Sequence, residues 1–293
     1  MASPPPRASF FTEGQKLAHK DSYIIVNHCY LQYIPPTTSS SASEKPALLF
    51  IHGGGLTGAM WESTPDLRQG WALLAARAGR HVYVLDGVDH GRSARAPDAE
   101  RQGDAEHRTA KEVWERFRIG THDRFAERQL FEGSQFPVEW FDSLLRVQSV
   151  RRRTTDEVER AGIVDAIKAL GKCVDVVAHS HGAALLQEAM VLEEVRPLLN
   201  RVVLVEPGGT ADAKLLDGEV KTLVVWGDYL QSHAAWKLIV EPFSKASVQN
   251  LHLPKQGIRG NTHFPMSDRN SDAVWGEIEK WLDAGQYGAD KRE

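Results

Sequence analysis

Short apolar runs alternate with segments of helical periodicity over most of the chain. Each run suits one buried strand and is too short for a helix, so we predict strands at 47–51, 81–85, 174–178, 202–205, 222–226 and 248–253. Apolar positions three or four residues apart predict helices at 71–79, 155–170, 182–195 and 272–283. Strands that alternate with helices are typical of a mostly parallel sheet with helices on both faces, so the pattern predicts an α/β fold.

The N-terminal region differs from the rest of the chain. Residues 1–20 show no sustained period, and we expect a flexible arm there. Residues 21–34 alternate in the manner of strands and add two strands before the run at 47–51. A chain of this length buries about three quarters of its extended-chain surface, so it needs no disulfide or metal to fold. We therefore predict a single domain over residues 21–293.

A long interval interrupts the alternation between the fourth and fifth expected strands, 81–85 and 174–178. Within it, residues 114–141 hold seven aromatic residues in 28, which is 25% against 8% for the chain. A polar surface loop would not carry so many, so the interval should pack on the body of the domain. We predict that residues 97–153 form a lid over a substrate pocket. The alternative is a helical insertion with a small core of its own.

Composition and charge narrow the class of protein. The apolar content of 42% and the net charge of −4 (35 basic against 39 acidic residues) are ordinary for a globular domain and argue against a dedicated nucleic-acid binder. We interpret Cys29 and Cys173 as free thiols, which favours a cytoplasmic location. The first residues lack the apolar run of a secretory signal, and no stretch is long and apolar enough to span a membrane. The sequence is compatible with a homodimer.

The sequence around Ser180 is the strongest chemical signal. An apolar strand runs into Ala178-His179-Ser180-His181-Gly182 and then into a helix. Small residues at 178 and 182 allow a tight strand-to-helix turn that exposes the serine hydroxyl above the sheet edge. This pattern predicts a nucleophile elbow, although a serine that merely caps the helix would leave the same local trace.

A glycine-rich loop follows the strand at 47–51. His52-Gly53-Gly54-Gly55 lets backbone N–H groups approach a ligand closely. With the elbow present, we expect the N–H groups of Gly54 and His181 to form an oxyanion hole.

Two other chemistries match parts of these motifs. Gly53-x-Gly55-x-x-Gly58, with Asp86 after the next strand, fits a dinucleotide fingerprint, but Pro65 falls where the helix should continue. His179-x-His181 could begin a metal site, but Ala183 and Ala184 stand where further ligands would be needed. We therefore expect neither a cofactor nor a metal.

A serine nucleophile needs a base and an acid that orients the base. Of the histidines that follow Ser180, we favour His263, which lies in a loop after the last strand, over His233 and His252. Glu206 and Asp228 both follow strands at the sheet edge where α/β sites gather, so spacing leaves both open as the acid.

Together, these segments resemble the α/β-hydrolase superfamily over about residues 45–285. The segment from Gly54 to Asp66 contains the short motifs Thr-Gly, Trp-Glu and Thr-Pro-Asp, and it resembles the corresponding segment in a group of bacterial and fungal esterases. In that group the acid is a Glu at the end of the sixth strand, so the resemblance implies Glu206 rather than Asp228. The resemblance also implies an α/β-hydrolase fold, in which the insertion at 97–153 replaces the usual cap after strand six.

We therefore expect a serine hydrolase that cleaves a small-molecule carboxylic ester or lactone. The alternatives on the same fold are a lyase, an acyl transferase, a cyclisation enzyme or a small-molecule receptor. We expect the run at 151–153 to be the solvated start of a helix rather than an anion site. The candidates for pocket walls are aromatic residues near the motifs or in the insertion: Trp61, Phe136, Trp140, Phe141 and Phe264.

Overall fold

The computed structural model describes residues 8–37, 45–93, 95–171, 173–209 and 220–284. Among these residues eight strands form one sheet in the order β1-β4-β6-β5-β7-β8-β9-β10. Their bounds are β1 Phe10–Phe11, β4 Tyr30–Ile34, β5 Leu48–Ile51, β6 Val82–Asp86, β7 Val174–His179, β8 Leu199–Val205, β9 Lys221–Trp226 and β10 Gln249–His252. Along the sheet, the neighbouring strands from β6 to β10 pair in parallel, whereas β4 pairs antiparallel with β1 and β6. These pairings confirm the predicted mostly parallel sheet of an α/β fold.

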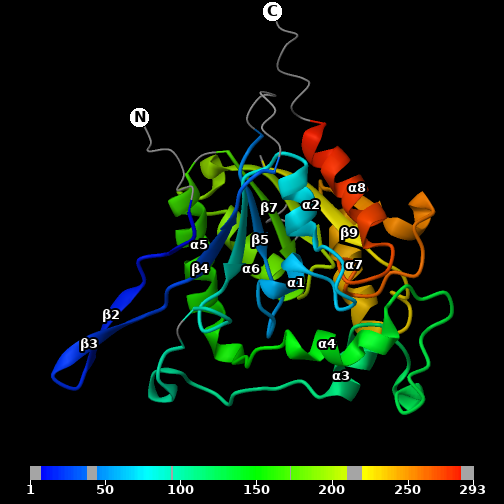
Figure 1. Cartoon of the computed structure of the whole chain (residues 1–293), viewed down its shortest axis with the longest axis horizontal. Coiled ribbons are helices and arrows are strands. Elements are labelled where there is room, and N and C mark those ends of the chain that lie inside the picture. The colour runs from blue at the N-terminus through cyan, green and yellow to red at the C-terminus, as the bar shows by residue number, and fades with distance from the viewer. Residues whose placement is uncertain (1–7, 38–44, 94, 172, 210–219, 285–293) are drawn as a thin grey trace, which may run out of the picture.

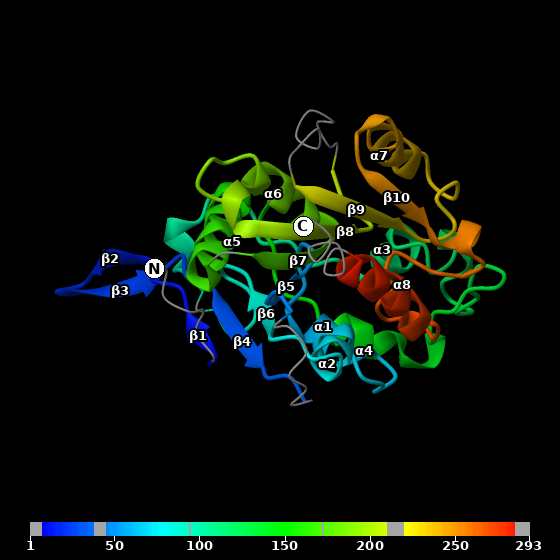
Figure 2. The same ribbon diagram turned by 90° about the horizontal axis from the view of Figure 1, so that it is seen from above.

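Helices cover both faces of the sheet (Figure 2). One face carries α2 (Trp71–Arg77) and α8 (Ser271–Asp283), and the other carries α5 (Asp156–Leu170) and α6 (Ser180–Met190). The shorter α1 (Ala59–Glu62) follows β5, and α7 (Ala234–Lys245) follows β9.

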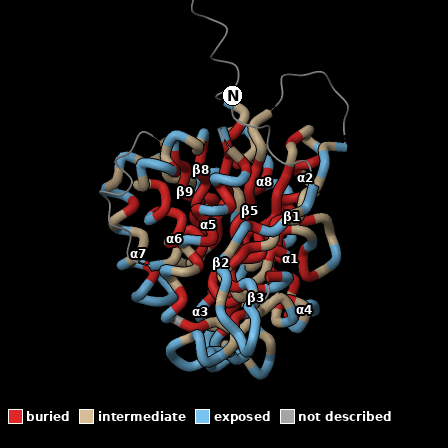
Figure 3. The backbone as a smooth tube through the Cα atoms, turned by 90° about the vertical axis from the view of Figure 1, so that its left-hand side faces the viewer, coloured by how far each residue is buried: buried red, intermediate tan, exposed pale blue. Residues whose placement is uncertain are grey.

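Alternate residues of the central strands enter two separate cores. Leu48 and Phe50 pack with α2 and α8, whereas Leu49 and Ile51 pack with α5 and α6. Side chains of each strand thus alternate between the two faces of the sheet, and both faces are buried. The strands appear as buried segments in Figure 3.

The N-terminal segment differs from the expected flexible arm. Residues 8–20 follow a defined path: β1 pairs with β4, and β2 (Gln15–His19) forms a hairpin with β3 (Ser22–Val26). The hairpin projects from the body and is largely exposed (Figures 1 and 3). Residues 1–7 of the expected arm lie outside the described residues.

The interval between β6 and α5 packs along one edge of the molecule (Figure 1). It contains α3 (Ala110–Arg116), α4 (Phe141–Arg146) and short 3-10 turns. Its buried aromatic residues join the core on the α2 and α8 face; they are Trp114, Phe117, Phe136 and Phe141. The loops that follow β5, β7 and β8 contact this interval, and the candidate site lies where they meet.

Candidate active site

Ser180 stands at the turn between β7 and α6. Its backbone has a φ of +51°, a left-handed conformation that is rare and strained for a residue with a side chain. Two residues later, a Cβ on Gly182 would lie 2.1 Å from the carbonyl oxygen of His52. Only glycine therefore lets α6 start this close to the loop after β5. These features are the physical marks of a nucleophile elbow.

Ser180, His263 and Glu206 form a hydrogen-bonded chain. The Ser180 Oγ lies 2.9 Å from Nε2 of His263, and Nδ1 of the same imidazole lies 3.3 Å from Oε2 of Glu206. The His263 and Glu206 side chains are buried, with 1% and 0% exposure. The imidazole can thus donate from Nδ1 to the carboxylate and accept from the hydroxyl at Nε2.

The carboxylate of Glu206 has two further partners. Its Oε1 accepts the Gly227 N–H at 2.5 Å and lies 2.7 Å from Nη2 of Arg118. Burial alone would raise the pKa of Glu206, but the charge of Arg118 and the hydrogen bond from His263 outweigh it and lower that pKa below its usual value. Glu206 is therefore held as an anion beside the imidazole.

Arg118 is a residue of the site that the sequence did not reveal. It follows α3 with a φ of +58°, its side chain is fully buried, and its guanidinium lies 4.3 Å from the centre of the Trp236 ring. Its Nε donates to the carbonyl of Asp228 at 2.9 Å. The preceding carbonyl, that of Phe117, accepts the His263 N–H at 3.0 Å. The insertion is thus fastened to both the base and its acid.

Asp228, the alternative acid, contacts the loop that carries His263. Its carboxylate accepts the N–H of Gly260, and its own N–H donates to the carbonyl of Asn261 at 2.8 Å. Asp268 supports the same loop by accepting the N–H and hydroxyl of Thr262 at 2.8 and 3.0 Å. The structure thus brings Glu206 to the imidazole, whereas Asp228 holds the loop that carries His263.

The other histidines have different neighbours. His233 caps α7 by accepting the Ala235 N–H at 3.1 Å, and His252 ends β10. Nε2 of the buried His179 lies 2.8 Å from the carbonyl oxygen of His263, whereas His181 faces Asp156 at 3.0 Å. The two histidines of the metal pattern therefore point to different groups, and no cluster of three metal-ligating residues occurs in the described part of the chain.

Gly54 and His181 lie side by side next to Ser180. A Cβ on Gly54 would lie 2.9 Å from the Cβ of His181, and one on Gly53 would lie 3.2 Å from the Cβ of Ser180. The N–H of His181 belongs to the first turn of α6, where N–H groups have no partner within the helix. The two expected oxyanion residues are thus brought together, and Arg108 donates to the Gly54 carbonyl at 2.7 Å.

Asp86 holds neighbouring loops together. A dinucleotide fingerprint would instead need its carboxylate to bind a ribose. The Asp86 carboxylate accepts the N–H groups of Gly58 and Arg92 at 2.7 and 2.8 Å, and Nε of Arg92 at 2.6 Å. The helix after the glycines is α1, which has only four residues. Both facts contradict a dinucleotide fingerprint at this loop.

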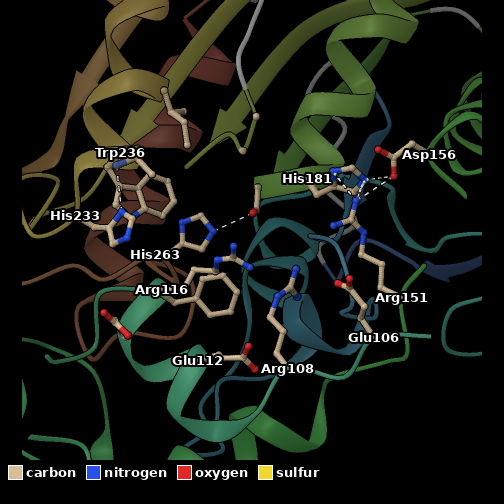
Figure 4. A pocket seen from close by; sticks show the side chains of 17 residues that line it. Glu106, Arg108, Glu112, Arg116, Arg151, Asp156, His181, His233, Trp236 and His263 are labelled. Atoms are coloured by element: carbon tan, nitrogen blue, oxygen red, sulfur yellow. Dashed lines mark hydrogen bonds and ion pairs between the residues drawn. The ribbon is translucent and has the colours of Figure 1, made fainter. Parts of the chain in front are cut away.

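A cavity of about 660 Å³ opens in front of Ser180 (Figure 4). One wall comes from the insertion and the start of α5, and it is rich in charge. The opposite wall comes from the loop after β8 and from α7, and it includes Trp236 and Ile239. The charged lining residues are Glu106, Arg108, Glu112, Glu115, Arg116, Arg151 and Asp156.

None of the five aromatic residues expected to line the pocket lines this cavity. Four are buried in the core beside it because the insertion and α1 need an apolar interior: Trp61, Phe136, Phe141 and Phe264. Trp140 is 40% exposed on the surface. Phe117, Trp236 and Ile239 supply the apolar lining instead.

Arg151 also departs from the expected solvated start of a helix. Its side chain is only 15% exposed and lines the cavity. Its Nη2 lies 3.0 Å from Oδ1 of Asp156 and 2.9 Å from Nε2 of His181 (Figure 4). Its backbone N–H and carbonyl pair with those of Glu106 in a short antiparallel bridge within the insertion.

Comparison with known proteins identifies the family. A model of the alpha/beta hydrolase family matches residues 48–275. The chain belongs to the alpha/beta hydrolase family. This match confirms the superfamily expected from the sequence.

Among solved structures, this alpha/beta hydrolase resembles a novel bacterial esterase, with 24% identity, a TM-score of 0.80, and coverage of 97% of this chain and 98% of that one. It also resembles the naproxen esterase of Bacillus subtilis, with 8% identity, a TM-score of 0.53, and coverage of 95% and 92%. At these identities the likeness concerns the fold alone.

One curated relative shares part of the sequence. A probable secreted lipase, phiG, from a fungal species is 34% identical over 85 residues, which are 29% of this chain and 21% of that protein. The alignment thus spans about a fifth of the relative's length. In the described residues, no helix has the length and apolar character needed to cross a membrane.

Proposed function

We propose that this alpha/beta hydrolase is a serine hydrolase that cleaves a carboxylic ester or lactone. The observation that carries the proposal is the chain of contacts from Ser180 through His263 to Glu206 at the base of the cavity. A serine on a strained elbow, bonded to a buried imidazole that a carboxylate orients, is suited to nucleophilic attack on a carbonyl.

In the proposed reaction, Ser180 attacks the carbonyl carbon while Nε2 of His263 accepts the hydroxyl proton. Glu206 fixes the imidazole tautomer and stabilises the imidazolium that forms. The N–H groups of Gly54 and His181 bind the oxyanion of the tetrahedral intermediate, each contributing about 3–4 kcal/mol. His263 then gives its proton to the leaving alcohol, and an acyl-enzyme remains.

The second half of the reaction uses the same groups. His263 accepts a proton from water, which attacks the acyl-enzyme, and the acid leaves as Ser180 regains its proton. No step needs a cofactor or a metal. Rapid turnover of simple p-nitrophenyl esters supports this function, whereas tight binding without product release would indicate a receptor.

The reaction should depend on pH through His263, because only the neutral imidazole accepts the serine proton. Burial lowers the pKa of His263 to about 4, despite the opposing effect of Glu206. We therefore expect kcat/KM to rise with pH around pH 4 and to stay nearly constant from pH 5 to 7. The midpoint of the rise would then lie below the pKa of an ordinary imidazole. Ester hydrolysis measured across this range, with circular dichroism to verify folding, checks the midpoint. A midpoint near the ordinary value would contradict the lowering of the His263 pKa by burial.

Replacement of Arg118 tests whether it positions the acid and base. In Arg118→Met, loss of one partner of a buried ion pair should cost about 3–5 kcal/mol of stability. The positive charge of Arg118 lowers the pKa of His263, so its removal should move the acid limb of kcat/KM to higher pH. The conservative Arg118→Lys variant keeps the charge and should retain most of the wild-type profile. Loss of stability without any shift of the limb would assign Arg118 a structural role alone.

A further inference from the structure

Two arginines on the cavity wall lack a carboxylate partner. Arg108 and Arg116 both come from the insertion and line the cavity in front of Ser180. In the part of the chain that the structure describes, neither forms an ion pair with an acidic side chain. Figure 4 shows both guanidinium groups directed toward the space beside His263.

The acidic residues of the same wall are already engaged. Glu112 caps α3, where its Oε2 accepts the N–H and the hydroxyl of Thr109 at 2.7 and 2.9 Å. The remaining acids also have partners: Glu115 pairs with His122, Asp156 with Arg151 and His181, and Glu106 is not free. Four carboxylates and three guanidinium groups share this wall, but among the described residues the guanidinium groups of Arg108 and Arg116 have no direct carboxylate contact.

The guanidinium groups of Arg108 and Arg151 lie close to the reacting groups. Arg108 donates to the carbonyl of Gly54 at 2.7 Å, and a Cβ on Gly54 would lie 3.2 Å from Nε of Arg151. Burial, followed by the charges of Arg151 and Arg116, lowers the pKa of Arg108 to about 10. In addition, the buried Nε of Arg151 has no hydrogen-bond partner. Three guanidinium groups thus share one region, and of these only that of Arg151 has a direct carboxylate partner, Asp156.

The opposite wall of the cavity is apolar. Trp236 and Ile239 of α7 face the cavity there. On the side of the insertion, Phe117 stacks on the imidazole of His263 with ring centres 5.0 Å apart. A molecule that fits both walls carries an apolar part on one side of its ester bond and a negative charge within reach of the other side.

From this asymmetry we propose that the natural substrate is an ester or lactone bearing a second, ionised carboxylate, which Arg108 and Arg116 bind. The proposal rests on the ester hydrolysis proposed above and names its substrate class. A planar guanidinium matches a carboxylate through paired N–H donors, so recognition would favour the anion over a neutral ester of equal length. Arg151 adds to the positive field without being required as a direct ligand.

A pair of matched substrates tests the proposal. Monomethyl adipate carries the ionised carboxylate, and dimethyl adipate has the same chain without the charge. We expect the wild-type kcat/KM to favour the monoester by about tenfold or more, as for a charged hydrogen bond. Arg108→Gln and Arg116→Gln should each reduce this ratio, mainly through a higher KM for the monoester. The ratio cancels any effect of Arg108 on the shared ester chemistry through Gly54.

The matched control is Arg146→Gln, because Arg146 is an exposed arginine of α4 that lies away from the cavity. It should leave the ratio unchanged. Equal or faster hydrolysis of the diester by the wild type would overturn the anion site while leaving the esterase intact. If neither adipate ester is hydrolysed, turnover of p-nitrophenyl esters decides the proposed function, and calorimetry with adipate decides the anion site separately. Binding that weakens in Arg108→Gln and Arg116→Gln supports the site, and absence of binding to the wild type overturns it.

Discussion

Replacing Ser180 by alanine is expected to reduce kcat/KM for p-nitrophenyl esters by about 10⁵-fold, to the residual level that oxyanion binding alone supports. The change removes only the hydroxyl oxygen, which contacts Nε2 of His263, so the fold should be unaffected. The release of p-nitrophenol measures the rate, and thermal unfolding monitors the fold.

The matched control for this experiment is Ser232→Ala. Ser232 is exposed in the segment that precedes α7 and has no contact with the imidazole. It should retain wild-type activity. Turnover in Ser180→Ala comparable to that of the wild type would mean that another residue attacks the ester.

Glu206→Gln should have the next largest effect, a loss of about 10⁴-fold in kcat, because an amide cannot stabilise the imidazolium and can hold the wrong tautomer. Asp228→Asn should lose about tenfold or less, since an amide oxygen can still accept the N–H of Gly260. Steady-state kinetics of both variants under one set of conditions provide the comparison.

The variant with the larger loss of kcat identifies the acid that orients His263. Glu206 contacts Nδ1 of His263, whereas the carboxylate of Asp228 contacts backbone of the loop. A larger loss in Asp228→Asn would reverse the assignment of the acid. Thermal unfolding is needed alongside, because Glu206→Gln also leaves the buried Arg118 without its anionic partner.

The central architecture was predictable because its physical signals are local. Buried parallel strands favour nearly continuous apolar runs, and the runs at 174–178 and 222–226 became β7 and β9. The elbow at Ser180 and the late His263 were also visible, since a strand, a tight turn and a helix leave marks on adjacent residues.

The N-terminal segment was harder to predict for a related reason. β1 has only two residues, which is too short to show a period, and β2 is mostly exposed on both sides. Its pairing depends on partners supplied by β3 and β4, so composition alone resembled a loose arm.

The walls of the cavity depended on contacts between distant segments. Aromatic residues of the insertion were visible, but not whether Phe136 would face substrate or the interior, and it faces the interior. Arg118 lies in no motif, and its partner Glu206 is brought to it only by the folded chain. Arg151 was hidden in a charged run that ordinarily marks a solvated surface.

The most direct test of the central claim is to treat the protein with an alkyl p-nitrophenyl phosphonate and locate the adduct. Our account predicts the release of one equivalent of p-nitrophenol, a single phosphonylated peptide modified at Ser180, and no adduct in Ser180→Ala. An adduct on another residue, or stoichiometric labelling of Ser180→Ala, would contradict it.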